Sequence, residues 1–336
     1  MPTKFIDYKG ELMGPQVIVI GAGQWGKNLV RTFRELDALA AVVESAPHLR
    51  VGLSNDYPAV PLFEDYKEAI ENTDAKGVVI ATPAPTHYEI ASYALQAGKD
   101  VFVEKPITLS TADAQKLVEL AEKLQRILMV GHLLLYQPAI RKIKELIEVG
   151  SIGSLKSLHQ ERMKLGRVRS VENVLWSFGV HDIAVFLYLT GQAPEHMVTS
   201  SQAIVQSDVE DDYYLHLTFT NGTVAHLHTS WLWPEMRRRL VVIGDQGMLL
   251  YDEEKQTVTL HQKGIHADLS NRDEGSEVVF EGAVQPLRLE CQHFLECIDQ
   301  RIKPLSDGAN GLEVIRVLEQ ASAALSSSAP KGMSVE

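Results

Sequence analysis

The chain has 336 residues, a formal net charge of −12, 45% hydrophobic residues and 23% charged residues. This composition is ordinary for a globular protein, and the length allows two domains with separate cores. The acidic balance argues against a general nucleic-acid-binding protein, which would carry a basic surface. No apolar run reaches the roughly 18 residues of a membrane span. Residues 1–8 also lack the apolar segment of a secretory signal.

The chain has only two cysteines, Cys291 and Cys297. They lie on an expected helix, about 240° apart at roughly 3.6 residues per turn, so we expect no disulfide between them. Together with the missing signal segment, this favours a reducing, cytoplasmic location.

From about residue 15 to residue 131, short apolar runs alternate with helical patterns. The alternation predicts βαβ units and a parallel sheet. A capping box begins at Ser110, and Gly98 fits a helix stop. The expected strands are 16–20, 38–43, 78–81, 100–103 and 127–130, and the expected helices are 25–36, 64–71, 86–97 and 110–125. Residues 1–131 are therefore predicted to form a Rossmann dinucleotide-binding domain.

After Gly131 the pattern becomes mixed. Asn221-Gly222 predicts a hairpin between residues 213–220 and 223–231. Other expected strands are 155–165, 238–243, 247–252 and 256–262, and the expected helices are 138–149, 177–190, 287–301 and 309–326. The prediction for 132–336 is an α+β substrate-binding and oligomerisation domain with a large, mostly antiparallel open sheet. Its C-terminal helix can pack back on the first domain.

The first apolar strand leads into the turn Gly21-Ala22-Gly23-Gln24-Trp25-Gly26. This spacing lets the backbone approach a pyrophosphate at a helix N-terminus. Glu44 ends the second strand, where a carboxylate binds ribose hydroxyls and repels a 2′-phosphate, so we expect NAD rather than NADP. The expected cofactor-binding residues are Gly21, Gly23, Gln24, Trp25, Gly26, Glu44, Thr82, Pro83, His87, Glu104 and Lys105.

The run 101–103 is followed by Glu104-Lys105-Pro106. In an open parallel sheet, ligands bind at the carboxyl ends of the strands. Pro106 favours an extended backbone at Lys105, which keeps this lysine out of the next helix. Lys105 is therefore placed for chemistry on a substrate beside the cofactor.

These motifs, with Ala81-Thr82-Pro83 and Gly131-His132, resemble the glucose-fructose oxidoreductase/inositol dehydrogenase family over nearly the whole chain. The resemblance implies a Rossmann domain followed by an α/β domain whose open sheet mediates oligomer contacts. It also implies that Lys105 contacts the reacting hydroxyl near the nicotinamide.

Within that family, the second half is similar to the nucleotide-sugar 3-dehydrogenases. The stretches that carry the similarity are 165–169, 173–176, 181–183, 290–294 and 306–308. The similarity implies NAD-dependent oxidation of a UDP-sugar 3-hydroxyl, most specifically that of UDP-N-acetylglucosamine. Such a reaction feeds an aminotransferase that makes a 3-amino sugar for lipid A or lipopolysaccharide. The family often has Asp where this chain has Ser177, which can cap a helix but leaves the tuning of His181 open.

Oxidation of an alcohol by NAD needs a proton acceptor beside the hydride acceptor. His181 has the better ordinary pKa for that role, with Lys105 as the polarising group, although the reverse division stays open. A basic patch lies upstream of His181 and consists of Arg162, Lys164, Arg167 and Arg169. These cations suit a diphosphate, or the patch is simply a solvated face. Tyr136 is either a substrate contact or part of the core. The expected substrate-binding residues are Tyr136, Arg162, Lys164, Arg167, Arg169, Trp176 and His181.

His216, His226 and His228 raise the question of a metal site. A two-residue turn at Asn221-Gly222 would place His226 opposite Leu217 and His216 opposite Leu227, so the three side chains would not converge. We therefore expect no metal site. The same pairing predicts Thr218, Ala225 and Thr229 on the open face of the sheet.

Three alternatives remain at this level: a UDP-N-acetylglucosaminuronate 3-dehydrogenase, an inositol or simple-sugar dehydrogenase, and a non-catalytic NAD-binding sensor or scaffold. In each case we expect a cytoplasmic homo-oligomer, dimer or tetramer, without nucleic-acid or membrane partners. An aminotransferase would be a downstream partner of the 3-dehydrogenases.

Overall fold

The computed structural model describes residues 5–6, 12–166, 168–282 and 285–328. The chain divides into two compact units, Met1–Leu133 with Gln285–Ile315, and Leu134–Val284 with Arg316–Glu336. The long C-terminal helix α9 (Gly308–Ser328) begins in the first unit and ends in the second. No helix in the described ranges is long and apolar enough to cross a membrane.

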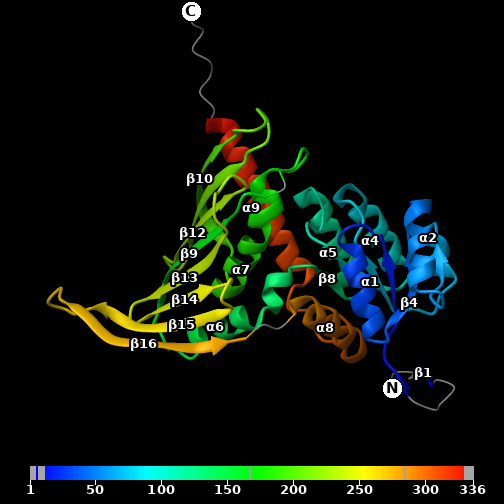
Figure 1. Ribbon diagram of the computed structural model, residues 1–336, viewed down its shortest axis with the longest axis horizontal. Helices are drawn as coiled ribbons and strands as arrows, with labels where there is room; N and C mark the ends of the chain where they lie inside the picture. The colour runs from blue at the N-terminus through cyan, green and yellow to red at the C-terminus, as the bar shows by residue number, and fades with distance from the viewer. Residues whose placement is uncertain (1–4, 7–11, 167, 283–284, 329–336) are drawn as a thin grey trace, which may run out of the picture. The chain divides into compact units, whose positions relative to one another are not determined.

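The first unit contains a six-stranded parallel sheet of order β5-β4-β3-β6-β7-β8 (Figure 1). Its strands are β3 (Val17–Ile20), β4 (Leu39–Val43), β5 (Leu62–Phe63), β6 (Gly77–Ile80), β7 (Asp100–Val103) and β8 (Leu128–Val130). The central strands are buried on both faces, which explains their uninterrupted apolar sequences. The predicted Rossmann sheet is confirmed, and only the two-residue β5 was missed. A separate short pair, β1 (Phe5–Ile6) and β2 (Leu12–Met13), precedes the sheet.

Helices cover both faces of this sheet, as right-handed crossovers require. They are α1 (Gly26–Glu35), α2 (Pro47–Asp56), α3 (Tyr66–Glu71), η1 (Ala84–Thr86), α4 (His87–Gln96), α5 (Thr111–Leu124) and α8 (Pro286–Gln300). Ser110 caps α5 by accepting a hydrogen bond from Asp113 N at 3.1 Å, and Gly98 follows α4 with φ +77°. Helix α2 was missed because it buries only Leu53 and so has no apolar stripe.

The second unit contains an eight-stranded sheet of order β10-β11-β12-β9-β13-β14-β15-β16. All neighbouring pairs are antiparallel except β12 with β9. The strands are β9 (Leu155–Met163), β10 (Pro194–Gln202), β11 (Asp212–Phe219), β12 (Val224–Ser230), β13 (Arg237–Gly244), β14 (Met248–Asp252), β15 (Thr257–Ile265) and β16 (Asn271–Glu281). The mostly antiparallel sheet is confirmed, although β10 and β16 were not predicted.

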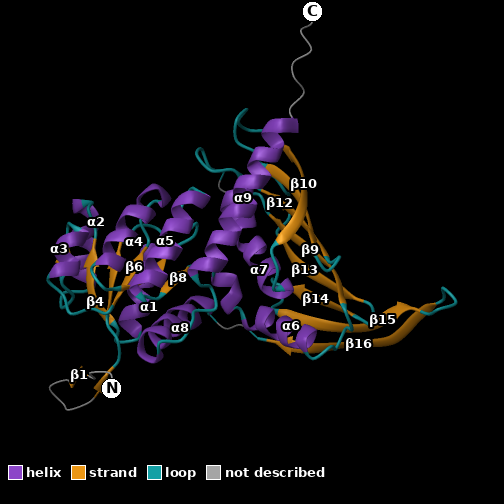
Figure 2. Cartoon of the chain, turned by 180° about the vertical axis from the view of Figure 1, so that it is seen from behind, coloured by secondary structure: helices purple, strands orange, loops and turns teal. Residues whose placement is uncertain are grey.

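Helices pack on one face of this sheet, and in the described part of the chain none covers the other face (Figure 2). They are η2 (Leu133–Tyr136), α6 (Pro138–Glu148), the π-helical turn η3 (Leu175–Gly179), α7 (Val180–Thr190) and the second part of α9. Tyr213 shows the covered side, because its hydroxyl donates to Ala321 O in α9 at 3.0 Å. The expectation of an open sheet is therefore met.

The predicted hairpin forms, but its register differs by one residue from the predicted one. Phe219 N donates to Thr223 O at 2.9 Å, so the loop has three residues and ends at Gly222 with φ +81°. A three-residue loop with glycine in the left-handed region is a standard alternative to the two-residue turn. Ala225 and Thr229 are consequently buried rather than on the open face, where Thr218 does lie.

The corrected register brings three histidines together on the open face. His216 lies opposite His226, with the two Nδ1 atoms 2.6 Å apart, and His159 of β9 stacks on His226 at 4.7 Å between ring centroids. Burial and then the charges of His159 and His216 lower the pKa of His226. His228 instead stacks on Tyr214. Among the described residues, no group of three or more His, Cys, Asp and Glu is placed to hold a metal ion.

Ser177 does not cap the helix that carries His181, contrary to the prediction. It lies inside the turn η3, and its hydroxyl donates to Val174 O at 3.5 Å. Asn173 occupies the capping role instead, because its Oδ1 accepts a hydrogen bond from Trp176 N at 3.1 Å.

Candidate active site

The glycine turn after β3 has the geometry that a dinucleotide phosphate needs. Gly21 has φ +88°, and a Cβ on Gly26 would lie 2.0 Å from Gly21 O, so neither position accepts a side chain. A Cβ on Gly23 would meet no described atom within 4 Å, which leaves open space for a close approach. The first turn of α1 contains no acidic residue. The turn and helix N-terminus therefore fit the pyrophosphate of NAD.

A groove of about 530 Å³ extends from this turn along the carboxyl ends of β4 and β6. Glu44, Thr82 and Pro83 line it. Both oxygens of Glu44 accept hydrogen bonds from backbone N–H groups, from Ala22 at 2.8 Å and from Ala46 at 2.9 Å. These bonds hold the carboxylate at the groove, where its charge opposes a 2′-phosphate.

Neutralising Glu44 is expected to relax the choice of cofactor. In Glu44→Gln, we expect the NAD dissociation constant to rise by about 10- to 100-fold, because a charge-assisted hydrogen bond contributes about 1.5–3 kcal/mol. NADP binding should strengthen at the same time. Fluorescence titration with both nucleotides measures this, with the exposed Glu35→Gln of α1 as the control. Unchanged preference for NAD would show that another group selects the cofactor.

His87 is buried and does not face the groove as a free ligand for the cofactor. Its Nδ1 lies 2.8 Å from Pro106 O, and its Nε2 lies 2.8 Å from Thr82 O. It therefore ties the loop after β6 to the loop after β7. Because backbone carbonyls occupy both ring nitrogens, neither nitrogen is available for the predicted cofactor contact.

Glu104 and Lys105 follow β7 at the carboxyl edge of the sheet. Trp25 Nε1 donates to Glu104 Oε1 at 2.5 Å, and Lys105 N donates to Glu104 Oε2 at 3.3 Å. Burial raises the pKa of Glu104 to about 7, against the opposing effects of Trp25 and Lys105. A Cβ on Gly131 would lie 2.8 Å from Glu104 Oε2, which explains the glycine before His132. Glu104 and Trp25 thus link the glycine turn to the strand end that carries Lys105.

His132 follows β8 and is 1% exposed. Burial and the charge of Lys105 lower the pKa of His132 to about 3, so its imidazole is neutral. Neither ring nitrogen has a hydrogen-bond partner among the described residues. His132 belongs to a motif noted in the sequence, but the sequence did not predict that the charge of Lys105 acts on this histidine.

In the second unit, His181 is half-buried in the first turn of α7. The next residue, Asp182, is buried and belongs to an ion pair. Trp176 Nε1 donates to Ser322 Oγ at 3.1 Å, and Tyr136 is 1% exposed. Tyr136 therefore lies in the core, the second of its two predicted alternatives, whereas Trp176 is only half-buried.

Arg162 does not belong to an exposed basic patch. Its Nε donates to Asp182 Oδ2 at 2.8 Å, and its Nη2 donates to Glu253 Oε2 at 3.0 Å. Burial works against the charged form of Arg162, but Asp182 and Glu253 outweigh it and raise the pKa of the guanidinium. The prediction of a diphosphate contact at Arg162 is therefore wrong in this conformation, because two buried carboxylates already bind the side chain.

The rest of the patch is less constrained. Arg169 is exposed and lies 3.6 Å from Glu172, between Nε and Oε1. Lys164 is half-buried. Arg167 lies outside the described residues. Arg169 and Lys164 are thus the described cations of this segment whose side chains are exposed or half-buried.

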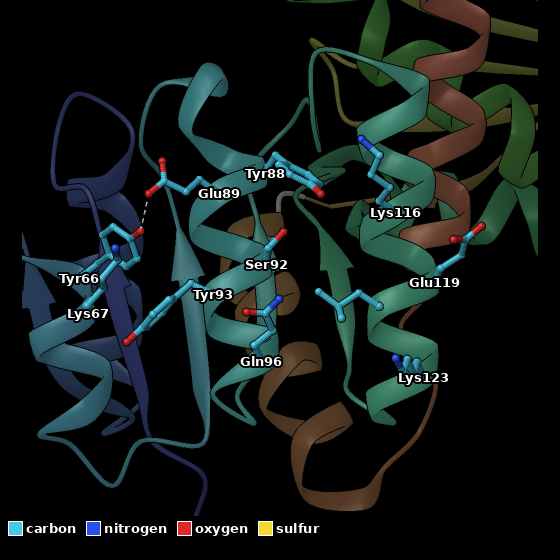
Figure 3. Close-up of a pocket in the computed structure, with 11 residues that line it drawn as sticks. Tyr66, Lys67, Tyr88, Glu89, Ser92, Tyr93, Gln96, Lys116, Glu119 and Lys123 are labelled. Carbon is cyan, nitrogen blue, oxygen red and sulfur yellow. Dashed lines mark hydrogen bonds between the residues drawn. The ribbon is translucent and has the colours of Figure 1, made fainter.

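A larger hollow of about 610 Å³ lies on the outer faces of α3, α4 and α5 (Figure 3). Three tyrosines and three lysines line it, and Tyr66 donates to Glu89 Oε1 at 2.8 Å. The glycine turn and Lys105 are not among its lining residues. We therefore place the active site at the groove rather than at this larger hollow.

Comparison with known proteins identifies the family to which both units belong. Residues 16–132 match the model of the "Oxidoreductase family, NAD-binding Rossmann fold". Residues 140–250 match the "GFO/IDH/MocA C-terminal domain". The first match contains every predicted cofactor residue, and the second contains Arg162 and His181.

Several relatives match nearly the whole chain. A UDP-N-acetylglucosamine 3-dehydrogenase from Acidithiobacillus ferrooxidans is 27% identical over 301 residues, covering 88% of this chain and 93% of its own length. A solved structure of that enzyme has a TM-score of 0.83, 26% identity, and covers 93% of this chain and 98% of its own. An oxidoreductase structure from Magnetospirillum magnetotacticum MS-1 is 30% identical, with a TM-score of 0.80 and coverage of 91% and 99%.

Proposed function

Because this chain belongs to the Gfo/Idh/MocA family of NAD-binding oxidoreductases, we propose that it oxidises the 3-hydroxyl of a UDP-sugar, with UDP-N-acetylglucosamine as the first candidate. The observation that carries the proposal is Lys105 at the carboxyl end of β7, in the same sheet as a glycine turn that fits NAD. The similarity to a UDP-N-acetylglucosamine 3-dehydrogenase over most of both chains supports the substrate class.

Each protein group has a defined part in this reaction. Bound NAD supplies the hydride acceptor. Lys105 polarises the hydroxyl oxygen, and Glu104 orients the lysine segment through its bonds to Trp25 and Lys105 N. We assign the proton acceptor role to His181, whose ordinary pKa suits a base near neutrality. The reverse division between Lys105 and His181 is the alternative.

The proposal is tested with purified protein, NAD and UDP-N-acetylglucosamine. The expected product is NADH with a 3-keto sugar, which an added aminotransferase converts to a 3-amino sugar. UDP-N-acetylglucosaminuronate and free myo-inositol are tested in parallel. Absence of NADH with every UDP-sugar would overturn the proposal, and NAD binding without any turnover would favour a sensor.

Arg169 is expected to act on substrate affinity rather than on catalysis. In Arg169→Ala, we expect KM for the UDP-sugar to rise by about tenfold, because an arginine–phosphate contact contributes about 1.5–3 kcal/mol. kcat and the KM for NAD should stay unchanged. Arg31→Ala, an exposed arginine of α1, is the control. The same KM in both variants would place the diphosphate elsewhere.

One observation favours the second candidate, a dehydrogenase of inositol or a simple sugar. Arg162 is bound by Asp182 and Glu253, so the patch offers fewer cations for a diphosphate than the sequence indicates. This candidate predicts turnover of free polyols and no effect of Arg169→Ala.

We also propose that the open sheet face mediates a homo-oligomer. Eight strands at about 4.8 Å spacing and roughly 28 Å length present about 1,000 Å², against about 800 Å² per partner in a typical stable interface. Light scattering after size exclusion distinguishes dimer from tetramer, and a monomer would contradict the proposal. We place the reaction in the cytoplasm, before transamination in lipopolysaccharide synthesis.

A further inference from the structure

Helix α8 runs antiparallel to β7, the strand that leads to Lys105. Arg301, just after the helix, donates from Nη1 to Asp100 Oδ2 at 2.6 Å, where β7 begins. Further along, Phe294 packs edge-on against Phe102, with ring centroids 5.6 Å apart. The N-terminal part of α8 therefore lies along the carboxyl end of β7.

This alignment brings Glu290 towards Glu104. Glu290 precedes Phe294 by one helical turn and shares its face, while Glu104 follows Phe102 by two residues and shares its side of the strand. Burial, and then the charge of Glu104, raises the pKa of Glu290, in agreement with this alignment. Both side chains are buried, with Glu290 0% and Glu104 8% exposed. Two acids thus lie in the interior of the first unit beside Lys105.

The two carboxyl groups differ in their hydrogen bonds. Glu104 accepts from Trp25 Nε1 and from Lys105 N. Neither oxygen of Glu290 has a hydrogen-bond partner within the described residues. A buried carboxylate without donors is far less stable than the neutral acid, whereas donors stabilise the ionised form. A proton shared by the pair therefore resides on Glu290.

We propose that Glu104 is the member of the pair that ionises, that Glu290 keeps its proton when Glu104 has lost its own, and that Lys105 therefore faces at most a single carboxylate charge. Two ionised carboxylates in this interior would repel each other and would stabilise the protonated lysine too strongly. Glu290 is thus a positioning residue that acts on Lys105 through Glu104. The effect on Lys105 rests on the proposed function, but the location of the proton does not.

The location of the proton is measured by infrared spectroscopy of the whole protein at mildly alkaline pH, where Glu104 is ionised. We expect a carbonyl stretch from a protonated carboxyl group in the wild-type protein, lost in Glu290→Gln and retained in Glu296→Gln. Glu296 lies on the same helix and is exposed, so it is the matched control. A spectrum without this band, or one unchanged by Glu290→Gln, would overturn the proposal. If the variant does not fold, the infrared spectrum of the wild-type protein, recorded as pH is raised, still decides whether a protonated carboxyl group is present.

Stability gives a second test. Burial, followed by the charge of Glu104, raises the pKa of Glu290 well above its ordinary value. The folded protein then holds a proton that the unfolded chain releases above about pH 4.3, so stability falls as pH rises. Between about pH 5 and pH 8, the melting temperature of Glu290→Gln should fall less than that of the wild-type protein. The melting temperature of Glu296→Gln should fall as much as that of the wild-type protein. Equal slopes in all three proteins would contradict the proposal.

The pH dependence of kcat/KM tests whether Glu290 is neutral or ionised beside Glu104 and Lys105. Gln and a protonated Glu are both neutral, so Glu290→Gln should keep the wild-type profile near neutral pH. Glu104→Gln removes the carboxylate beside Lys105, so its lysine-dependent limb should move to lower pH. A displaced limb in Glu290→Gln would show that Glu290 is ionised. Failure to turn over any UDP-sugar would remove the proposed function, while the infrared and stability results would still locate the proton.

Discussion

Lys105→Met is expected to abolish most turnover while NAD still binds. The lysine lies directly after β7, and its own backbone N–H is bound to Glu104, so the substitution leaves the glycine turn and Glu44 in place. Loss of a polarising or proton-transferring group costs about 10²- to 10⁴-fold in kcat. Stopped-flow measurement of NADH formation, with NAD binding followed separately, checks this result.

Two further variants show what Lys105 contributes. Lys105→Arg keeps a positive charge but cannot give up its proton near neutral pH, so it separates electrostatic polarisation from proton transfer. Lys123→Met, an exposed lysine of α5, controls for the loss of a surface charge. A loss below about tenfold in Lys105→Met would assign the chemistry to another group, with His181 as the first alternative.

The parts of the site that were predictable from the sequence are contiguous motifs. The glycine turn, Glu44 and Lys105 each follow a buried strand whose apolar run is readable by itself, and strand order then brings them to one sheet edge. The cofactor groove could thus be located before any contact was known. Elements without such a pattern were missed, as α2 shows with its single buried residue.

Long-range pairing explains the remaining errors. Arg162 and Glu253 are 91 positions apart, and nothing near Arg162 in the sequence indicates that a buried carboxylate binds it. The hairpin register depended on one added loop residue, which reversed the faces of Ala225 and Thr229. Glu290 was noted only as part of a resemblance, because its proximity to Glu104 depends on how α8 packs against β7.

Arg162→Met should cause the largest loss of stability of any substitution considered for this chain. Asp182 and Glu253 have side chains that are 1% and 10% exposed, and the guanidinium pairs with both, while Glu253 also pairs with Arg238. Breaking a buried ion pair by removing one partner costs about 3–5 kcal/mol, because the remaining charges stay buried and repel each other. For a chain of this size, we expect the melting temperature to fall by about 4–7 °C.

The second substitution distinguishes the ion-pair network from a substrate contact. Arg162→Met combined with Asp182→Asn removes one of the two stranded carboxylates, so it should recover part of the lost stability. Arg238 still binds Glu253 Oε1 at 2.8 Å, and it therefore neutralises the other carboxylate in the double variant. Differential scanning calorimetry measures both variants, and Arg169→Met provides the exposed control. An Arg162→Met protein with normal stability but a raised KM for the UDP-sugar would instead return Arg162 to the diphosphate site.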